Sequence, residues 1–151
     1  MSSETAPLSD QILIALRQRV EAQALAKQLN ITLMAVAPGR AVVQMDTGEE
    51  VTNILGGIHG TAIFALIDEA FQAACNAHGS VAVALNMNLT FHRAPQVGEV
   101  LTAEATELHC GRRTGTYLIT VTDARQKRIA TCQAVAYRTG ERLPFLPPEV
   151  G

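Results

Sequence analysis

The chain has 151 residues, of which 48% are hydrophobic and 17% charged, and its formal net charge is −2. This length is typical of one domain with a core of its own, and no run of Lys or Arg indicates a nucleic-acid partner. No apolar stretch reaches the roughly 20 residues of a membrane span, and the polar N-terminus lacks the pattern of a signal peptide. We therefore expect a single cytoplasmic domain over residues 1–151, without a nucleic-acid or membrane partner.

The three cysteines are Cys75, Cys110 and Cys132, and none belongs to a CxxC pair. An odd number without such pairs is typical of reduced, mostly buried thiols in a cytoplasmic protein. Because no cluster of His and Cys has the spacing of zinc ligands, we expect no metal site, and nothing indicates another cofactor.

The first element, within about residues 1–30, is predicted to be a surface helix. Ser9 and Asp10 offer an N-cap, and residues 11–28 are helix formers without Gly or Pro. Asn30 is a suitable stop for this helix.

Two strands and a loop are expected next. Residues 31–37 and 40–46 flank the pair Pro38-Gly39, which is typical of a tight turn between antiparallel strands. Residues 47–57 contain three glycines and are predicted to form a loop.

A long apolar helix is predicted over residues 59–77, with Gly79 as its C-terminal stop. Its apolar residues recur at spacings of three and four, which places them on one face of a helix. These residues are Ala62, Ile63, Leu66, Ile67, Ala70 and Ala74.

The rest of the chain is predicted to form a four-stranded antiparallel meander followed by an extended tail over residues 139–151. Apolar residues alternate strictly with smaller or polar ones in the first of these strands. The strands are expected at residues 81–92, 99–110, 113–123 and 128–138. The fold class is therefore α+β, with a core over residues 31–138 in which an antiparallel sheet surrounds one long central helix.

The segment from Asn53 to Phe71 contains the parts of an acyl-transfer site. Glycines and His59 precede a helix, whose first N–H groups lack intrahelical acceptors and can hold a developing negative charge. Asp68 lies inside that helix, where its carboxylate could activate water or attack directly. Taken one by one, His59 is equally a helix cap, Asn53 a turn residue and Asp68 a solvent-facing carboxylate.

Taken together, several motifs resemble those of the hotdog-fold acyl-CoA thioesterases, most closely the phenylacetyl-CoA thioesterase branch. The similarity runs from Asn53 to Tyr137. Its motifs are Asn53-x5-His59-Gly60, Asp68-Glu-Ala-Phe71, Ala74-Cys75-Asn76, Phe91-His-Arg93-Ala-Pro95 with Gly98-Glu99, and Gly111-Arg-Arg-Thr114-Gly-x-Tyr117. The resemblance implies a hotdog fold, hydrolysis of acyl-CoA without a cofactor, and a homotetramer made as a dimer of dimers.

The resemblance also implies roles for single residues. Asp68 would be the nucleophile or the general base, and the backbone N–H of Gly60 would hold the carbonyl oxygen of the thioester. Asn53 and His59 would position the thioester or the water. The chain departs from the family at Thr61, where a second glycine is usual, and in residues 82–85, which lack the Ser or Thr that family members often have there.

The spacing of the two catalytic candidates has a consequence for assembly. Asp68 lies eight residues beyond Gly60, which is about 12 Å along a helix that rises about 1.5 Å per residue. One carbonyl group cannot touch both ends of that span. If Gly60 and Asp68 share a substrate, they come from two antiparallel copies of the helix, so we predict a homodimer with two sites at its interface.

Five more residues are candidates for binding the acyl-CoA substrate. Thr61 and Gln72 share the helix stripe of Asp68, where small and polar side chains leave room for a substrate or a partner helix. Arg93, Arg112 and Arg113 are candidates for contacting the coenzyme A phosphates.

The leading functional hypothesis is an acyl-CoA thioesterase that acts on medium-chain or aromatic, phenylacetyl-type acyl groups. A hotdog dehydratase or hydratase is the enzymatic alternative, and it would use His59 with Asp68 to move a proton at carbon without releasing a thiol. A non-catalytic acyl-CoA binder is the second alternative, and it would bind the thioester without hydrolysing it.

Overall fold

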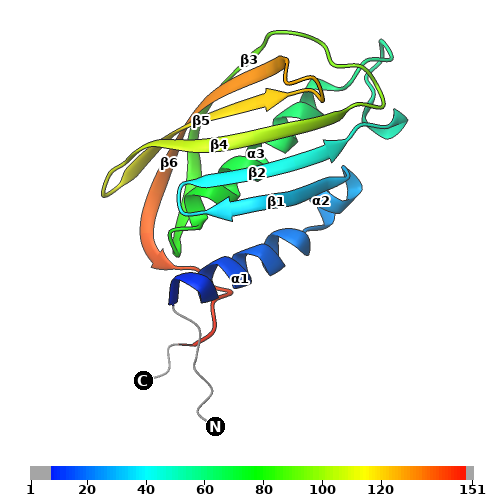
Figure 1. Cartoon of the computed structure of the whole chain (residues 1–151). Helices are drawn as coiled ribbons and strands as arrows, with labels where there is room; N and C mark the ends of the chain where they lie inside the picture. The colour runs from blue at the N-terminus through cyan, green and yellow to red at the C-terminus, as the bar shows by residue number, and fades with distance from the viewer. Residues whose placement is uncertain (1–7, 149–151) are drawn as a thin grey trace.

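The computed structural model describes residues 8–148, in which an antiparallel sheet curves around one long helix (Figure 1). The helices are α1 (Leu8–Glu21), α2 (Ala24–Gln28), the short 3-10 helix η1 (Glu49–Val51) and α3 (Gly60–Asn76). The strands are β1 (Ile31–Ala37), β2 (Arg40–Asp46), β3 (Ser80–Phe91), β4 (Val100–Cys110), β5 (Thr114–Thr122) and β6 (Arg128–Arg142). The predicted α+β arrangement of a sheet around a central helix is confirmed.

Helix α3 forms the centre of the hydrophobic core. Its buried side chains follow the helical period and include Leu66, Ile67 and Phe71, as the apolar spacing predicted. The ring of Phe71 packs edge-on against Tyr117 of β5, with 5.3 Å between the ring centroids. The strands turn mostly small and β-branched side chains toward this helix, among them Ala41, Val43, Ala103, Ala105, Ile119, Val121, Ala134 and Ala136.

The predicted helix over residues 11–28 is wrong in one respect, because the structure divides it into α1 and α2. The chain is extended at Gln23, with φ −67° and ψ 125°. The Gln23 side chain donates a hydrogen bond to the carboxylate of Glu69 on α3, at 3.1 Å. The hydrogen bond satisfies this buried carboxylate at the point where the helix breaks, and no residue of the helix itself signals the break.

The predicted meander is also wrong in its order, because the sheet runs β1-β2-β4-β5-β6-β3. Strand β3 pairs with β6, not with β4, and β4 pairs with β2. The side chain of Asn76, the last residue of α3, donates to the carbonyl of Ala82 and accepts from its N–H, at 3.0 and 2.9 Å. This contact ties the start of β3 to the end of the helix. Residues 92–99 then cross the end of the sheet and lead to β4.

The chain from Thr139 onward is less extended than predicted. Strand β6 continues to Arg142, which pairs with Ser80, and Leu143 and Leu146 are buried. The rest of the predicted tail, residues 149–151, lies outside the described residues.

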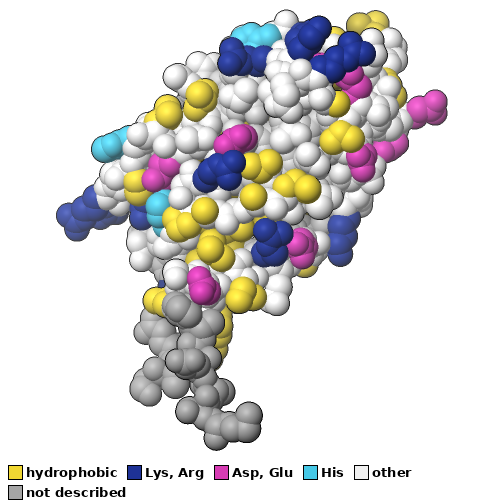
Figure 2. All heavy atoms as spheres, in the orientation of Figure 1, with side chains coloured by type: hydrophobic (Ala, Val, Ile, Leu, Met, Phe, Trp, Pro, Cys, Tyr) yellow, Lys and Arg dark blue, Asp and Glu magenta, His cyan; other side chains and the backbone are white. Residues whose placement is uncertain are grey.

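The outer face of the sheet carries side chains of positive and of negative charge. Figure 2 shows Lys and Arg side chains interspersed with Asp, Glu and hydrophobic ones on this face. Among the described residues, no helix has the length and apolar character to cross a membrane.

Candidate active site

The start of helix α3 leaves one backbone N–H group available. His59 is the N-cap, and its Nδ1 accepts a hydrogen bond from the N–H of Thr61 at 3.1 Å. The N–H groups of Ala62 and Ile63 both donate to the carbonyl of His59. Among the described residues, Gly60 has no hydrogen-bond acceptor for its N–H, so this group is free to bind a ligand at the positive end of the helix.

The turn before α3 is built by Asn53. Its Oδ1 accepts hydrogen bonds from the N–H groups of Leu55 and Gly57, at 2.9 and 3.2 Å. Thr52 and Ile58 pair antiparallel below this turn and close a short hairpin. The Asn53 oxygen therefore shapes the backbone, and only its Nδ2 remains to act on a thioester or a water.

Phe91, at the end of β3, borders the free N–H group, which the sequence did not suggest. A Cβ atom placed on Gly60 would lie 3.2 Å from Cζ of Phe91. The lack of a side chain at Gly60 thus keeps a narrow space between the helix start and this aromatic ring.

Asp68 lies two turns into α3 with its side chain half-buried. Among the described residues, none donates a hydrogen bond to its carboxylate and none forms an ion pair with it. Burial raises the pKa of the Asp68 carboxyl above its ordinary value. A carboxylate that is partly desolvated and unpaired is a stronger base or nucleophile than one held by hydrogen bonds.

A second carboxylate, Glu69, follows Asp68 but is 7% exposed and hydrogen-bonded. Burial raises its pKa, while hydrogen bonds from Gln72 and Gln23 act in the opposite direction. Gln72 donates in turn to Oε1 of Gln23, at 3.0 Å. The only sequence signal for this network is a Glu on the apolar side of the helix.

Predicted site residues line two of the cavities that flank α3 on the side of the N-terminal helices. One, of about 330 Å³, contains His59 and Thr61 and is otherwise lined largely by Leu25, Leu29, Val51, Ala62 and Ala65. The other, of about 520 Å³, contains Gln72 and lies farther along the helix. The structure therefore brings the predicted residues His59 and Thr61 to one cavity and Gln72 to the other.

The three arginine candidates lie at two distant places, and all are exposed. The N–H of Arg93 donates to the carbonyl of Ile129, whereas Arg113 accepts from the N–H of Arg138, beside Arg112. The β6 residues that make these two contacts, Ile129 and Arg138, are nine positions apart. That separation is about 30 Å at about 3.4 Å per residue. Within one subunit, Arg93 and Arg113 cannot bind the same phosphate.

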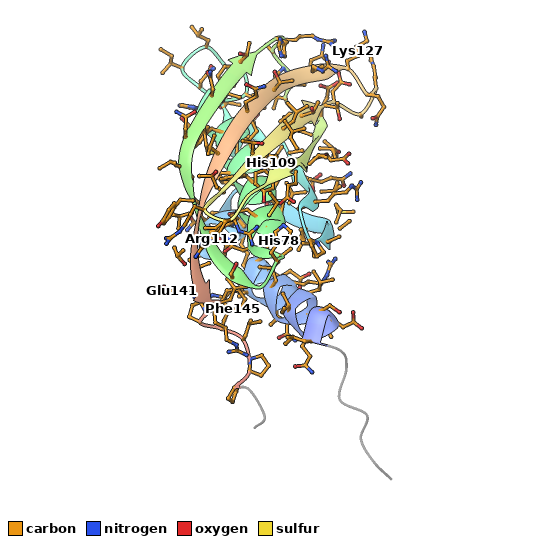
Figure 3. All side chains as sticks on the ribbon, turned by 90° about the vertical axis from the view of Figure 1, so that its left-hand side faces the viewer. His78, His109, Arg112, Lys127, Glu141 and Phe145 are labelled. Carbon is orange, nitrogen blue, oxygen red and sulfur yellow. The ribbon has the colours of Figure 1, made fainter. Side chains whose placement is uncertain are left out.

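A network of polar side chains joins the far end of α3 to the sheet. Glu107 accepts hydrogen bonds from Tyr117 at 2.5 Å and contacts Nε2 of His78 at 2.7 Å. Although burial acts to raise it, the pKa of Glu107 is lowered by these two hydrogen bonds and by nearby positive charge. Figure 3 shows His78 and Arg112 on this part of the molecule.

The cysteines differ in burial. Cys75 and Cys132 are buried as expected, whereas Cys110 is exposed and receives a contact from the Arg138 guanidinium. His78, Glu107 and Cys110 hold ligand-type atoms within 4.8 Å of one another. The hydrogen bonds from Tyr117 and Arg138 already engage two of these three side chains.

Comparison with known proteins places this arrangement in a family. Residues 55–130 match the family model described as the Thioesterase superfamily. The acyl-coenzyme A thioesterase PaaI of Escherichia coli K12 is 37% identical over 120 residues, which cover 80% of this chain and 86% of that protein. A putative esterase of Archaeoglobus fulgidus is 37% identical over 77% of this chain and 75% of its own length.

The solved structure of the E. coli PaaI protein, from the phenylacetic acid degradation operon, matches with a TM-score of 0.84 at 34% identity. The match covers 90% of this chain and 99% of that chain. The chain therefore belongs to the thioesterase superfamily and has its hotdog fold. More narrowly, it is an acyl-CoA thioesterase of the PaaI type, a thioester hydrolase.

Proposed function

We propose that this enzyme hydrolyses medium-chain or aromatic, phenylacetyl-type acyl-CoA to the free acid and coenzyme A, with Asp68 and the backbone N–H of Gly60 as its catalytic groups. One observation carries the proposal. Among the described residues, none accepts a hydrogen bond from the N–H of Gly60 in the first turn of α3, and none pairs with the half-buried carboxylate of Asp68 on the same helix.

The carboxylate of Asp68 supplies the basic or nucleophilic group. It either removes a proton from a water that attacks the thioester carbonyl carbon, or attacks that carbon itself and forms an anhydride that water then hydrolyses. On both routes the C–S bond breaks, the thiolate of coenzyme A leaves with the bonding electron pair, and a proton from the attacking water balances the products. Burial raises the pKa of Asp68, which makes its carboxylate a stronger base toward the attacking water.

The N–H of Gly60 stabilises the charge that develops on the carbonyl oxygen. It lies at the helix N-terminus, where the helix dipole favours negative charge. His59 contributes a second group, because its Nδ1 accepts from Thr61 and a neutral imidazole then carries its proton on Nε2. This Nε2–H donor can bind the thioester or the attacking water.

The active site is shared between two subunits in this proposal. The separation of Gly60 and Asp68 along α3, about 12 Å, requires Asp68 to act on a thioester held by the partner's Gly60. Exposed hydrophobic side chains support a subunit interface along α3 and the edge strand β3. They are Phe64 on α3 and Val83, Leu85 and Phe91 on β3. The homotetramer and the cytoplasmic location stay predictions.

The cavity beside the helix start is the proposed site for the acyl group. Its volume of about 330 Å³ is at the small end of the range for ligand pockets. Apolar side chains from α2 and α3, Leu25 and Ala65 among them, line it beside His59 and Thr61. Thr61 narrows the entrance of this cavity, because its side chain occupies space that a second glycine would leave free.

Binding of the coenzyme A phosphates is assigned to arginines of both subunits. Arg93 follows Phe91 and therefore lies at the same end of α3 as Gly60. Arg112 and Arg113 lie at the opposite end of the helix, near Arg138. Antiparallel pairing of α3 brings the partner's Arg112 to the end where Arg93 lies, so both kinds of contact can serve one substrate.

The oxyanion role is tested by a matched pair of variants at Gly60. Gly60→Pro removes the N–H at the first helical position, where Pro is well tolerated, and the extended conformation of His59 suits a following Pro. Gly60→Ala keeps the N–H and adds only a Cβ against Phe91. We expect Gly60→Pro to reduce thiol release from phenylacetyl-CoA by about 100-fold or more, and Gly60→Ala to reduce it much less. Equal activity of the two variants would exclude the N–H from the mechanism.

The shared site is tested by mixing two inactive variants, Gly60→Pro and Asp68→Asn. If each site combines Gly60 of one subunit with Asp68 of the other, a mixed dimer contains one intact site and one with both defects. Subunit exchange should then restore about a quarter of the wild-type activity by random assortment. No recovery after verified exchange would place both groups of a site in one subunit.

A further inference from the structure

Two adjacent hydrophobic side chains before α3 are almost fully exposed, and no contact with another described residue accounts for their position. Ile54 is 101% exposed and Leu55 is 87% exposed, at the tip of the hairpin closed by Thr52 and Ile58. A single exposed aliphatic residue is ordinary in a soluble protein, but two neighbours extended into solvent at a tip form a compact hydrophobic knob.

The hairpin holds this tip in one conformation. Oδ1 of Asn53 accepts from the N–H groups of Leu55 and Gly57, and the N–H of Asn53 donates to the carbonyl of Gly57 at 2.8 Å. A surface that is ordered before it binds loses little conformational entropy on binding. The tip is therefore suited to insert into a preformed cavity.

The same chain contains a cavity of matching character. It has a volume of about 520 Å³ and lies between the α1–α2 junction, the second half of α3 and the segment that follows β6. Its apolar lining comes from distant parts of the sequence, and Figure 3 shows Phe145 near α1. The hydrophobic residues of the lining include Leu16, Val20, Val81, Leu143 and Phe145.

We propose that the tip Ile54–Leu55 of one subunit docks in this cavity of its partner. The inference rests on the shared active site proposed above, which sets the register of the two helices. If Gly60 faces the partner's Asp68 across two antiparallel helices, the chain that precedes Gly60 lies toward the C-terminal half of the partner's α3. The tip at Leu55, five residues before Gly60, then lies on the side of the partner's Asp68 where the cavity residues Gln72 and Asn76 stand.

Symmetry agrees with a second copy of this chain as the occupant. The uncharged tip suits the apolar part of the lining, and Arg19, the one charged side chain among the described residues that line the cavity, is exposed. Each subunit has both the knob and the hole, so a twofold axis forms the contact twice. The docked tip joins the turn before Gly60 to the helix that carries the partner's Asp68, and thereby fixes the distance between the two halves of each site.

The contact is tested by disulfide trapping in a Cys110→Ser background, which removes the exposed native thiol. Leu55→Cys combined with Phe145→Cys should give a covalent dimer on mild oxidation, seen on a non-reducing gel. The matched control combines Leu55→Cys with Gln133→Cys, because Gln133 is exposed on the outer face of the sheet. The control should stay uncrosslinked.

Sedimentation of the same proteins distinguishes a failure of the docking from a failure of the shared active site. A dimer that sediments normally but gives no disulfide from the first pair overturns the docking and leaves the shared active site intact. A monomer at all concentrations overturns the shared active site and the docking with it.

A second measurement needs no introduced thiol. The double variant Ile54→Ser, Leu55→Ser should raise the dimer dissociation constant about 10-fold or more, because buried aliphatic anchors dominate interfaces. Met34→Ser, which removes an exposed hydrophobic side chain from β1, is the control and should leave it unchanged. An unchanged constant in the double variant would contradict the docking.

Discussion

Nδ1 of His59 accepts a hydrogen bond from the backbone N–H of Thr61. An imidazole nitrogen accepts only when it is unprotonated, so this bond selects the neutral tautomer with its proton on Nε2. The same bond caps the helix and occupies an N–H that would otherwise compete with Gly60 for the substrate. In the proposed mechanism, one side chain therefore serves both the stability of α3 and the chemistry at its start.

Substitutions at His59 should separate these two roles. His59→Asn keeps a side-chain acceptor for Thr61 and removes the Nε2–H donor, so we expect near-wild-type stability and a loss of kcat of about 10-fold or more. His59→Ala should reduce kcat as much as His59→Asn does. It should also lose about 1 kcal/mol of stability, because no side chain then accepts the hydrogen bond of the helix cap. Urea unfolding and thiol release measure the two effects. Full activity in His59→Asn would limit His59 to capping.

Asp68 should link activity and stability to pH with opposite signs. Its folded pKa lies above the ordinary value of 3.8, so the folded state binds this proton more tightly than the unfolded chain. The contribution of this group to stability is thus fully present below pH 3.8 and is lost as the pH rises through the folded pKa. Hydrolysis requires the ionised group and should fall as the pH drops through that same folded pKa.

Asp68→Asn tests this linkage. We expect a loss of kcat of about 100-fold or more, together with a higher melting temperature at pH 7 that disappears at acid pH. Asp46→Asn, at an exposed position on β2, is the control and should change neither property. A variant that binds the thioester and hydrolyses it at the wild-type rate would remove Asp68 from the mechanism.

The sequence predicted local structure better than the relations between distant segments. The limits of β1 and β2 follow from the tight turn at Pro38-Gly39 that separates them, and α3 follows from its apolar period. The break at Gln23 could not be predicted, because the carboxylate that Gln23 binds there is Glu69, 46 positions away. Strand order was missed for the same reason, since alternation identifies a strand but not its neighbour.

The candidate site shows a similar division. The motifs predicted Gly60 and Asp68 on one helix as the catalytic residues, and the hydrogen bonds of the first turn distinguish Gly60 from Thr61 as the residue with an available N–H among the described residues. A turn role for Asn53 was one of the interpretations that the sequence left open, and the hydrogen bonds to its oxygen show that role. The sequence did not indicate that Phe91 lies against Gly60. Both contacts depend on the backbone path.

Tyr117 should stabilise the far end of α3 through Glu107. Tyr117→Phe removes a hydrogen bond to a carboxylate, and we expect a loss of about 1.5–3 kcal/mol at pH 7. The lowered pKa of Glu107 makes its contribution present above the ordinary value of 4.5 and lost as the pH falls through the folded pKa. The loss should therefore shrink at acid pH. Tyr137→Phe is the matched control, since its exposed hydroxyl contacts only Arg113 among the described residues.

The junction of α1 and α2 should depend on the hydrogen bond from Gln23 to Glu69. Gln23→Leu removes this donor and leaves a carboxylate that is 7% exposed with fewer partners, so we expect a loss of about 1–3 kcal/mol in urea unfolding. Gln18→Leu, at an exposed position of α1, is the control and should change stability by less than about 0.5 kcal/mol. Equal stability of the two variants would show that packing alone sets the break in the helix. If the prediction holds, the N-terminal helices are held on α3 by a polar contact next to Asp68, and Gln23→Leu should also alter the rate of thiol release.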